Sequence, residues 1–230
     1  MQKNNPKVLN AWAMYDWSNS VYNLVITTAI FPVYYLSVTD AAFGGDTVPF
    51  FGFEFKNEAL YGYAISFSFL LVALISPLLS GIADFGGRKK AFMQFFTTLG
   101  AMACLGLFFF TGENIELGIG LAILASVGYA AALVFYNAFL PEIATLDKMD
   151  GLSAKGFSLG YAGSVLLLIL NFAMIMKRDL FGFDAESDAD ALVMMRYSFL
   201  TVGVWWLAFS QYTFYYLKDS KAKQKITNDI

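Results

Sequence analysis

The stretch Ser80-Gly-Ile-Ala-Asp84-Phe-Gly-Gly87-Arg88-Lys89-Lys90 lies between two long apolar segments of the chain. Glycine tolerates the positive φ angles of sharp turns, so the paired glycines permit a tight turn. The basic cluster that follows is suited to the anionic cytoplasmic surface of a membrane. The stretch therefore predicts a short charged turn that joins two membrane-spanning helices.

The composition of the whole chain supports a membrane protein. Of its 230 residues, 58% are hydrophobic and only 14% are charged, whereas soluble domains are about 45–50% apolar and about 25% charged. The absence of histidine excludes histidine proton relays and most zinc sites. The single Cys104 excludes an intramolecular disulfide and is interpreted as a packing residue. We expect an all-α, polytopic membrane protein.

A helix needs about 20 apolar residues to cross the hydrocarbon core. Segments of this length predict six transmembrane helices that form one bundle over residues 1–217, followed by a polar cytoplasmic tail or the start of a linker at 218–230. The predicted spans are 12–38, 58–82, 90–111, 116–139, 155–176 and 194–217.

The distribution of Lys and Arg predicts the orientation of these helices. Both termini and the loops at 83–89 and 140–154 are rich in these residues, whereas the loops at 39–57, 112–115 and 177–193 are poor in them or acidic. Cytoplasmic loops carry the excess of basic residues, so we expect both termini in the cytoplasm. The aromatic run from Phe50 to Phe55 is interpreted as an interfacial segment, and the acidic run at 184–190 as a solvated loop.

The first predicted helix carries a polar stripe within an arc of about 100°, given 3.6 residues per turn. The stripe consists of Trp12, Asp16, Asn19, Ser20, Asn23 and Thr27. A charge at the centre of a bilayer costs about 2.5–3.5 kcal/mol even on the lenient insertion scale, so such a stripe should face the bundle interior or a wet cavity. We expect it to line a substrate or ion pathway.

Asp16 has two open interpretations. Burial of a carboxylate favours its protonated form, so a desolvated Asp16 could carry a proton. Alternatively, Asp16 lies about one turn into the predicted span and reaches the headgroups or Arg88.

Polar residues of later helices extend the set of candidates for the pathway: Tyr136, Asn137, Asn171 and Gln211. Each is either a solute ligand or a contact between helices. Gly156, Gly160 and Gly163 indicate close packing of the fifth helix, with a hinge as the alternative.

The charged turn resembles the signature loop between helices 2 and 3 of the major facilitator superfamily. The residues that fill its pattern are Ser80, Asp84, Gly87, Arg88 and Lys89, although Phe85 stands where the family usually has a basic residue and Ser80 replaces a glycine. The resemblance implies that this loop is a gate latch, rather than a ligand for solute. The alternative is that the basic cluster only sets the orientation of the helices in the membrane. An Asp in the turn would serve no purpose in that case, but the alternative stays open.

Three further segments narrow the resemblance to the vacuolar-effluxer-like branch, which includes fungal vacuolar amino-acid exporters. They are Trp12 to Ser20, Phe135 to Glu142 and Leu152 to Tyr161. Family members have twelve helices, so the resemblance implies the N-terminal half of a secondary transporter in the bacterial inner (plasma) membrane. Its partners would be lipid, a small polar solute (an amino acid is one candidate) with H+ or Na+, and a C-terminal half or second copy.

No nucleophile constellation, phosphate loop or metal-ligand spacing is visible, so the sequence predicts neither an enzyme nor a cofactor, metal or nucleic-acid partner. The competing interpretations are half of a cation-coupled sugar symporter, a homodimerising half-transporter, and a membrane subunit that does not transport.

Overall fold

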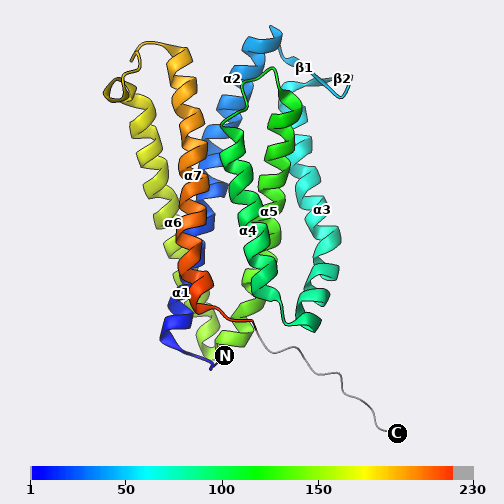
Figure 1. The fold of residues 1–230 in the computed structure, drawn as a ribbon, viewed down its shortest axis with the longest axis vertical. Coiled ribbons are helices and arrows are strands. Elements are labelled where there is room, and N and C mark those ends of the chain that lie inside the picture. Colours follow the sequence, from blue (N-terminus) through cyan, green and yellow to red (C-terminus); the bar gives the residue numbers. More distant parts are fainter. Residues whose placement is uncertain (1, 220–230) are drawn as a thin grey trace.

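The protein is a bundle of long, roughly parallel helices, shown in Figure 1. The computed structural model describes residues 2–219, without the side chains of residues 82–86. Six helices of this part are long and apolar enough to cross a membrane. The predicted all-α polytopic architecture is confirmed.

The first span is one continuous rod of 38 residues. It comprises α1 (Pro6–Val21), the π-helix η1 (Tyr22–Ile30) and α2 (Phe31–Phe43). Asn5 caps its start, because its side chain accepts a hydrogen bond from the backbone N–H of Lys7. The rod ends at Gly44, which adopts the left-handed conformation with φ of 71°.

The other spans are α3 (Asn57–Gly86), α4 (Lys89–Leu107), α5 (Ile115–Ile143), α6 (Leu146–Met176) and α7 (Asp188–Tyr216), with a short 3-10 helix η2 (Arg178–Phe181) before α7. α3, α5, α6 and α7 begin before their predicted apolar segments, whereas α4 ends at Leu107, four residues before its predicted end. Residues 146–154, which we expected in a loop, form the first turns of α6, so the connection from α5 contains only Ala144 and Thr145. The polar first turn is compatible with a helix because Asp147 complements the helix dipole there.

The aromatic run from Phe50 to Phe55, interpreted from the sequence as an interfacial segment, lies in a β-hairpin. Strands β1 (Thr47–Phe50) and β2 (Phe53–Lys56) pair antiparallel. The two residues between them, Phe51 and Gly52, both have positive φ angles, as tight hairpin turns require. Phe51 and Phe53 are 73% and 69% exposed.

The connections define two ends of the bundle. The N-terminus, the α3–α4 turn, the α5–α6 turn and the end of α7 lie at one end, which we call the N-terminal end (Figure 1). The β-hairpin and the α4–α5 and α6–α7 connections lie at the other, the hairpin end.

Candidate functional site

A buried carboxylate lies on α1. The Asp16 residue is 7% exposed, and Tyr136 on α5 donates a hydrogen bond to its Oδ2 atom over 2.9 Å. Among the described residues, no Lys or Arg forms an ion pair with Asp16. Because α1 begins at Pro6, Asp16 lies about three turns into the helix rather than one.

Tyr136 is held in place by aromatic packing. The Trp12 and Tyr136 rings stack with centroids 4.2 Å apart and planes within 10°, and Trp12 Nε1 donates to the backbone oxygen of Tyr136 over 2.9 Å. Tyr15 packs beside Tyr136, with ring centroids 5.1 Å apart. These contacts preorganise the phenol to hydrogen-bond the carboxylate.

Glycines on α6 let that helix approach α1 closely. A Cβ atom at Gly156 would lie 2.6 Å from Asp16 Oδ2, and one at Gly160 would lie 2.7 Å from Ser20 Oγ. At Gly163 it would lie 2.9 Å from the backbone oxygen of Trp17. The three glycines therefore let α6 pack closely against α1, which agrees with the packing interpretation of their spacing.

Two adjoining pockets lie between α1, α5 and α6, and we call them together the α1–α5–α6 groove. Their volumes are about 170 and 140 Å³. They share Ser20, Tyr129 and Phe157. Their other lining residues with a polar side-chain atom are Trp12, Asp16, Asn23, Tyr136, Asn137, Ser153, Tyr161 and Ser164. The lining contains one carboxylate and no cationic side chain.

Two buried polar atoms next to the groove have no hydrogen-bond partner among the described residues. They are Nδ2 of Asn19, a residue that is 0% exposed, and Oγ of Ser164, a residue that is 2% exposed. An unpaired buried polar atom costs about 1–3 kcal/mol. Ser164 lines the groove, so its hydroxyl has capacity for a further hydrogen bond there, and Asn19 is the chain neighbour of the lining residue Ser20.

The π-helix η1 divides the predicted polar stripe. Val, Ile and Thr residues, whose branched side chains disfavour an α-helix, are abundant in it. Pro32 lacks the N–H that would bond to the Thr28 oxygen in an α-helix. The Phe31 N–H instead donates to the Ile26 oxygen, five residues back.

As a result, the stripe residues have different environments. Asp16, Ser20 and Asn23 line the groove, whereas Asn19 is fully buried and is not among the lining residues. Thr27, within η1, is partly buried, and its Oγ1 has no partner in the described part of the chain. Asn23 is exposed and lies close to the middle of the 38-residue rod.

The pathway candidates predicted on the later helices lie in different environments. Tyr136 and Asn137 join the groove. Asn171 is 1% exposed and accepts a hydrogen bond from Thr201 of α7 over 2.8 Å, which is a contact between helices. Gln211 is exposed and donates to the Leu207 oxygen of its own helix. Ser153, Ser164 and Tyr129 were missed, because isolated small polar or aromatic residues in a helix carry no signal in one sequence.

The charged turn between α3 and α4 is shorter than expected. Gly87 has φ of 60°, which explains the glycine there, and Arg88 is exposed. The Ser80 residue is partly buried on α3. The side chain of Asp84 lies outside the described residues, so its predicted latch role stays a prediction.

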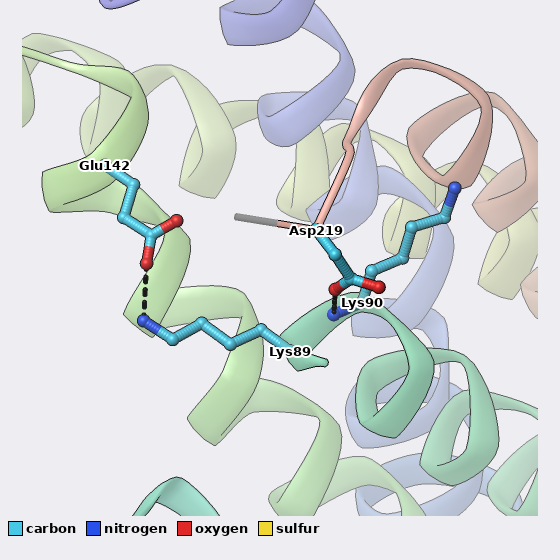
Figure 2. Close-up of polar contacts among 4 residues, drawn as sticks. All are labelled: Lys89, Lys90, Glu142 and Asp219. Atoms are coloured by element: carbon cyan, nitrogen blue, oxygen red, sulfur yellow. Dashed lines mark hydrogen bonds and ion pairs between the residues drawn. The ribbon is translucent and has the colours of Figure 1, made fainter. Parts of the chain in front are cut away.

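Lys89 is 8% exposed and points into the protein rather than toward a membrane surface. Its Nζ atom contacts Glu142 Oε1 of α5 at 2.5 Å, as Figure 2 shows. The backbone N–H of Lys90 donates to Asp219 Oδ1 over 2.7 Å. The start of α4 is thus tied both to α5 and to the segment that follows α7.

The model of one family, described as "Vacuole effluxer Atg22 like", matches residues 4–229. This chain belongs to that family. The vacuolar-effluxer-like branch predicted from the sequence is confirmed. One relative, given below, is named as a transporter.

The chain is 34% identical, over 211 residues, to the uncharacterized MFS-type transporter YxiO of Bacillus subtilis, covering 91% of this chain and 46% of the relative. It is 36% identical over 109 residues to autophagy-related protein 22 of Yarrowia lipolytica, covering 47% of this chain and 18% of the relative. To autophagy-related protein 22 of Gibberella zeae it is 32% identical over 91 residues, covering 40% of this chain and 14% of the relative. The chain thus spans less than half the length of these relatives. No solved structure matches.

Proposed function

We propose that this chain is one bundle of a secondary transporter, and that the α1–α5–α6 groove is its share of the pathway for a small polar solute. The carrying observation is Asp16, a buried carboxylate without a cationic partner among the described residues, in a polar groove on the first spanning helix. Alternating access, in which two bundles rock around a site near the midplane, is the mechanism that fits one such bundle.

Asp16 provides the electrostatic part of this proposal. An ionised carboxylate in a low-dielectric site needs a counter-charge or a proton. In the proposed cycle, H+, Na+ or a cationic group of the solute supplies it, and Tyr136 holds the carboxylate in position. Amino acids are the first solutes to test, because the sequence resembles amino-acid exporters; sugars are the second class.

The proposed partner is a C-terminal six-helix half, with a second copy of this chain as the alternative. The most apolar window of α3 is only 17% buried, and that of α6 is 33% buried. α3 exposes Tyr63, Phe67, Leu70, Leu74 and Leu78. The spacing of these residues by three or four positions places them on one helical face, which would pack on the partner or on lipid. We place the N-terminal end in the cytoplasm, following the Lys and Arg distribution.

Cysteine labelling tests whether the groove is wet. The native Cys104 is 0% exposed, so it gives a low background. We expect a membrane-impermeant maleimide to label Asn23→Cys and to leave Asn19→Cys unlabelled. Val204→Cys is the control, because Val204 is 58% exposed on α7 but apolar and should face lipid. Failure of Asn23→Cys to react, or equal labelling of Asn23→Cys and Val204→Cys, would refute the water-filled groove.

Solute counterflow tests the role of Asp16. In vesicles that contain the chain together with its C-terminal half, Asp16→Asn should reduce exchange about tenfold or more, since a charge-assisted contact contributes about 1.5–3 kcal/mol. The matched control is Asp150→Asn on the exposed side of α6, which should exchange normally. Normal exchange by Asp16→Asn would remove the carboxylate from the mechanism. Exchange by this chain alone would favour the second copy as partner.

A further inference from the structure

The carboxylate of Asp16 keeps one oxygen for a ligand. Tyr136 occupies Oδ2, to which it donates a hydrogen bond over 2.9 Å. The other oxygen, Oδ1, has no hydrogen-bond partner in the described part of the chain, and it is not one of the fully enclosed polar atoms. Asp16 lines the pocket of about 140 Å³. A ligand in this pocket can therefore reach Oδ1.

Ser20 supplies a second acceptor, one helical turn from Asp16. It lines both pockets of the α1–α5–α6 groove, and its hydroxyl donates to Asn19 Oδ1 over 3.4 Å. A hydroxyl has one donor and two lone pairs, so Ser20 Oγ is left with lone pairs for the pocket. The Tyr136 hydroxyl likewise uses its one donor on Asp16. Both hydroxyls suit a ligand that donates hydrogen bonds.

Aromatic side chains of α5 and α6 line the same space. Tyr129 and Phe157 line both pockets, and Tyr161 lines the larger one. Phe157 and Tyr161 lie four residues apart on α6, hence on one face of that helix, and they are 65% and 72% exposed. Neither ring packs against another aromatic ring among residues 2–219. The faces of aromatic rings attract cations and pack against apolar carbon skeletons.

The charge of the lining distinguishes cations from anions and zwitterions. Of the described residues that line the two pockets, only Asp16 is charged. A buried carboxylate without a counter-charge is costly, so a cation is favoured beside it and an anion is repelled. An amino acid carries a carboxylate two bonds from its amino nitrogen, and in this groove that second carboxylate meets no cationic side chain.

We propose that the α1–α5–α6 groove selects organic amines over amino acids. The ammonium group of the amine donates to Asp16 Oδ1 and Ser20 Oγ, and its apolar skeleton lies along Tyr129 and Phe157. An ammonium has three N–H donors, which suits two acceptors beside an aromatic wall. This inference rests on the proposed function, because the amine occupies the proposed pathway, and it narrows the class of solute.

Thermal unfolding of the purified protein in detergent tests the proposal with three probes of one skeleton. A ligand that binds only the folded state raises the melting temperature. Phenethylamine should raise it in a saturable way, whereas 3-phenylpropionate, with a carboxylate in place of the ammonium, should not. Phenylalanine carries both groups and should bind about tenfold more weakly than phenethylamine, because like charges repel. The shared phenyl group matches the background of partition into detergent.

Two variants locate the amine in the groove. Asp16→Asn should weaken phenethylamine binding about tenfold or more, because a charge-assisted hydrogen bond is lost. Phe157→Ala should weaken it about two- to fivefold, the value of a cation over an exposed ring. The matched controls are Asp150→Asn and Phe172→Ala, which change exposed residues of α6 outside both pockets and should bind normally. Where Asp16→Asn does not fold, Phe157→Ala and the three probes decide.

Three results would overturn the selection of amines: no shift or equal shifts with phenethylamine and 3-phenylpropionate, phenylalanine bound as tightly as phenethylamine, or unchanged phenethylamine binding in the variants that fold. The labelling of Asn23→Cys separates this failure from failure of the proposed function. A labelled Asn23→Cys together with any of these three results keeps the wet groove and rejects only the amine. An unlabelled Asn23→Cys rejects the pathway itself.

Discussion

Two interfaces of the same helix α5 have opposite character. Toward α4 the contact, which we call the packed seam, is close at two glycines and is covered by the Trp206 ring of α7. A Cβ at Gly128 would lie 2.5 Å from the Gly100 backbone, and one at Gly100 would lie 2.5 Å from the Trp206 ring. On the side of α5 that faces α1 and α6, the glycines Gly156 and Gly160 of α6 lie next to polar side chains, and two pockets remain. Close packing on one side thus provides a rigid support for a site on the other.

The largest effect should come from overpacking the packed seam. Gly128→Ala would place its methyl group against the backbone of Gly100, which cannot rotate away, so we expect destabilisation of about 3 kcal/mol. Thermal unfolding in detergent measures it. Gly120→Ala on the same helix meets nothing within 4 Å and should be neutral. Equal melting temperatures for the two variants would contradict a rigid seam.

The equivalent change on the groove side should cost less. Gly156→Ala approaches Asp16 Oδ2 and, at 3.0 Å, the Tyr136 hydroxyl. Both are ends of side chains that can shift, so we expect about 1–2 kcal/mol. Gly151→Ala on α6 meets open space and is the matched control in the same unfolding experiment. A loss as large as that of Gly128→Ala would mean that both interfaces of α5 are equally rigid.

The ion pair at the end of the packed seam comes next. Lys89→Met leaves Glu142 without its partner, and we expect a loss of about 1–2 kcal/mol, below the value of about 3–5 for fully buried pairs. The reason is that the two side chains are 10% and 27% exposed. Unfolding midpoints of Lys89→Met and of the Lys90→Met control measure it. The swap of Lys89→Glu with Glu142→Lys should recover part of the loss, and no recovery would argue against a direct pair.

The smallest effect concerns the start of α4. Asp219→Ala removes the acceptor of the Lys90 N–H, and capping interactions at exposed helix starts contribute about 0.5 kcal/mol or slightly more. Asp219→Asn keeps an acceptor oxygen and should lose less. The ranking of these two variants in thermal unfolding is the test, and the reverse order would exclude capping.

The sequence analysis identified the spans because apolar length is a local property. The spacing of Asp16 and Ser20 placed them on one face, and both line the groove, since an α-helical period of 3.6 residues holds from Pro6 to Val21; their role in a pathway stays a prediction. From Tyr22 onward this period no longer applies, because the π-helix depends on Pro32 together with packing of the branched residues; Asn23 still lines the groove, but Thr27 does not. The inward direction of Lys89 was equally hidden, because its partner Glu142 is 53 residues away.

By itself, the order of amino acids determined that this chain is a membrane bundle of the vacuole-effluxer-like branch. The length of the apolar segments, the basic loops and the short motifs are all local features of the sequence. Only the tertiary structure decided which polar residues share a groove. Asp16 and Tyr136 meet because α5 returns beside α1, and Gly156 lets α6 approach both side chains. Asn171 instead meets Thr201. Such pairings depend on how helices pack over distances that no local pattern encodes.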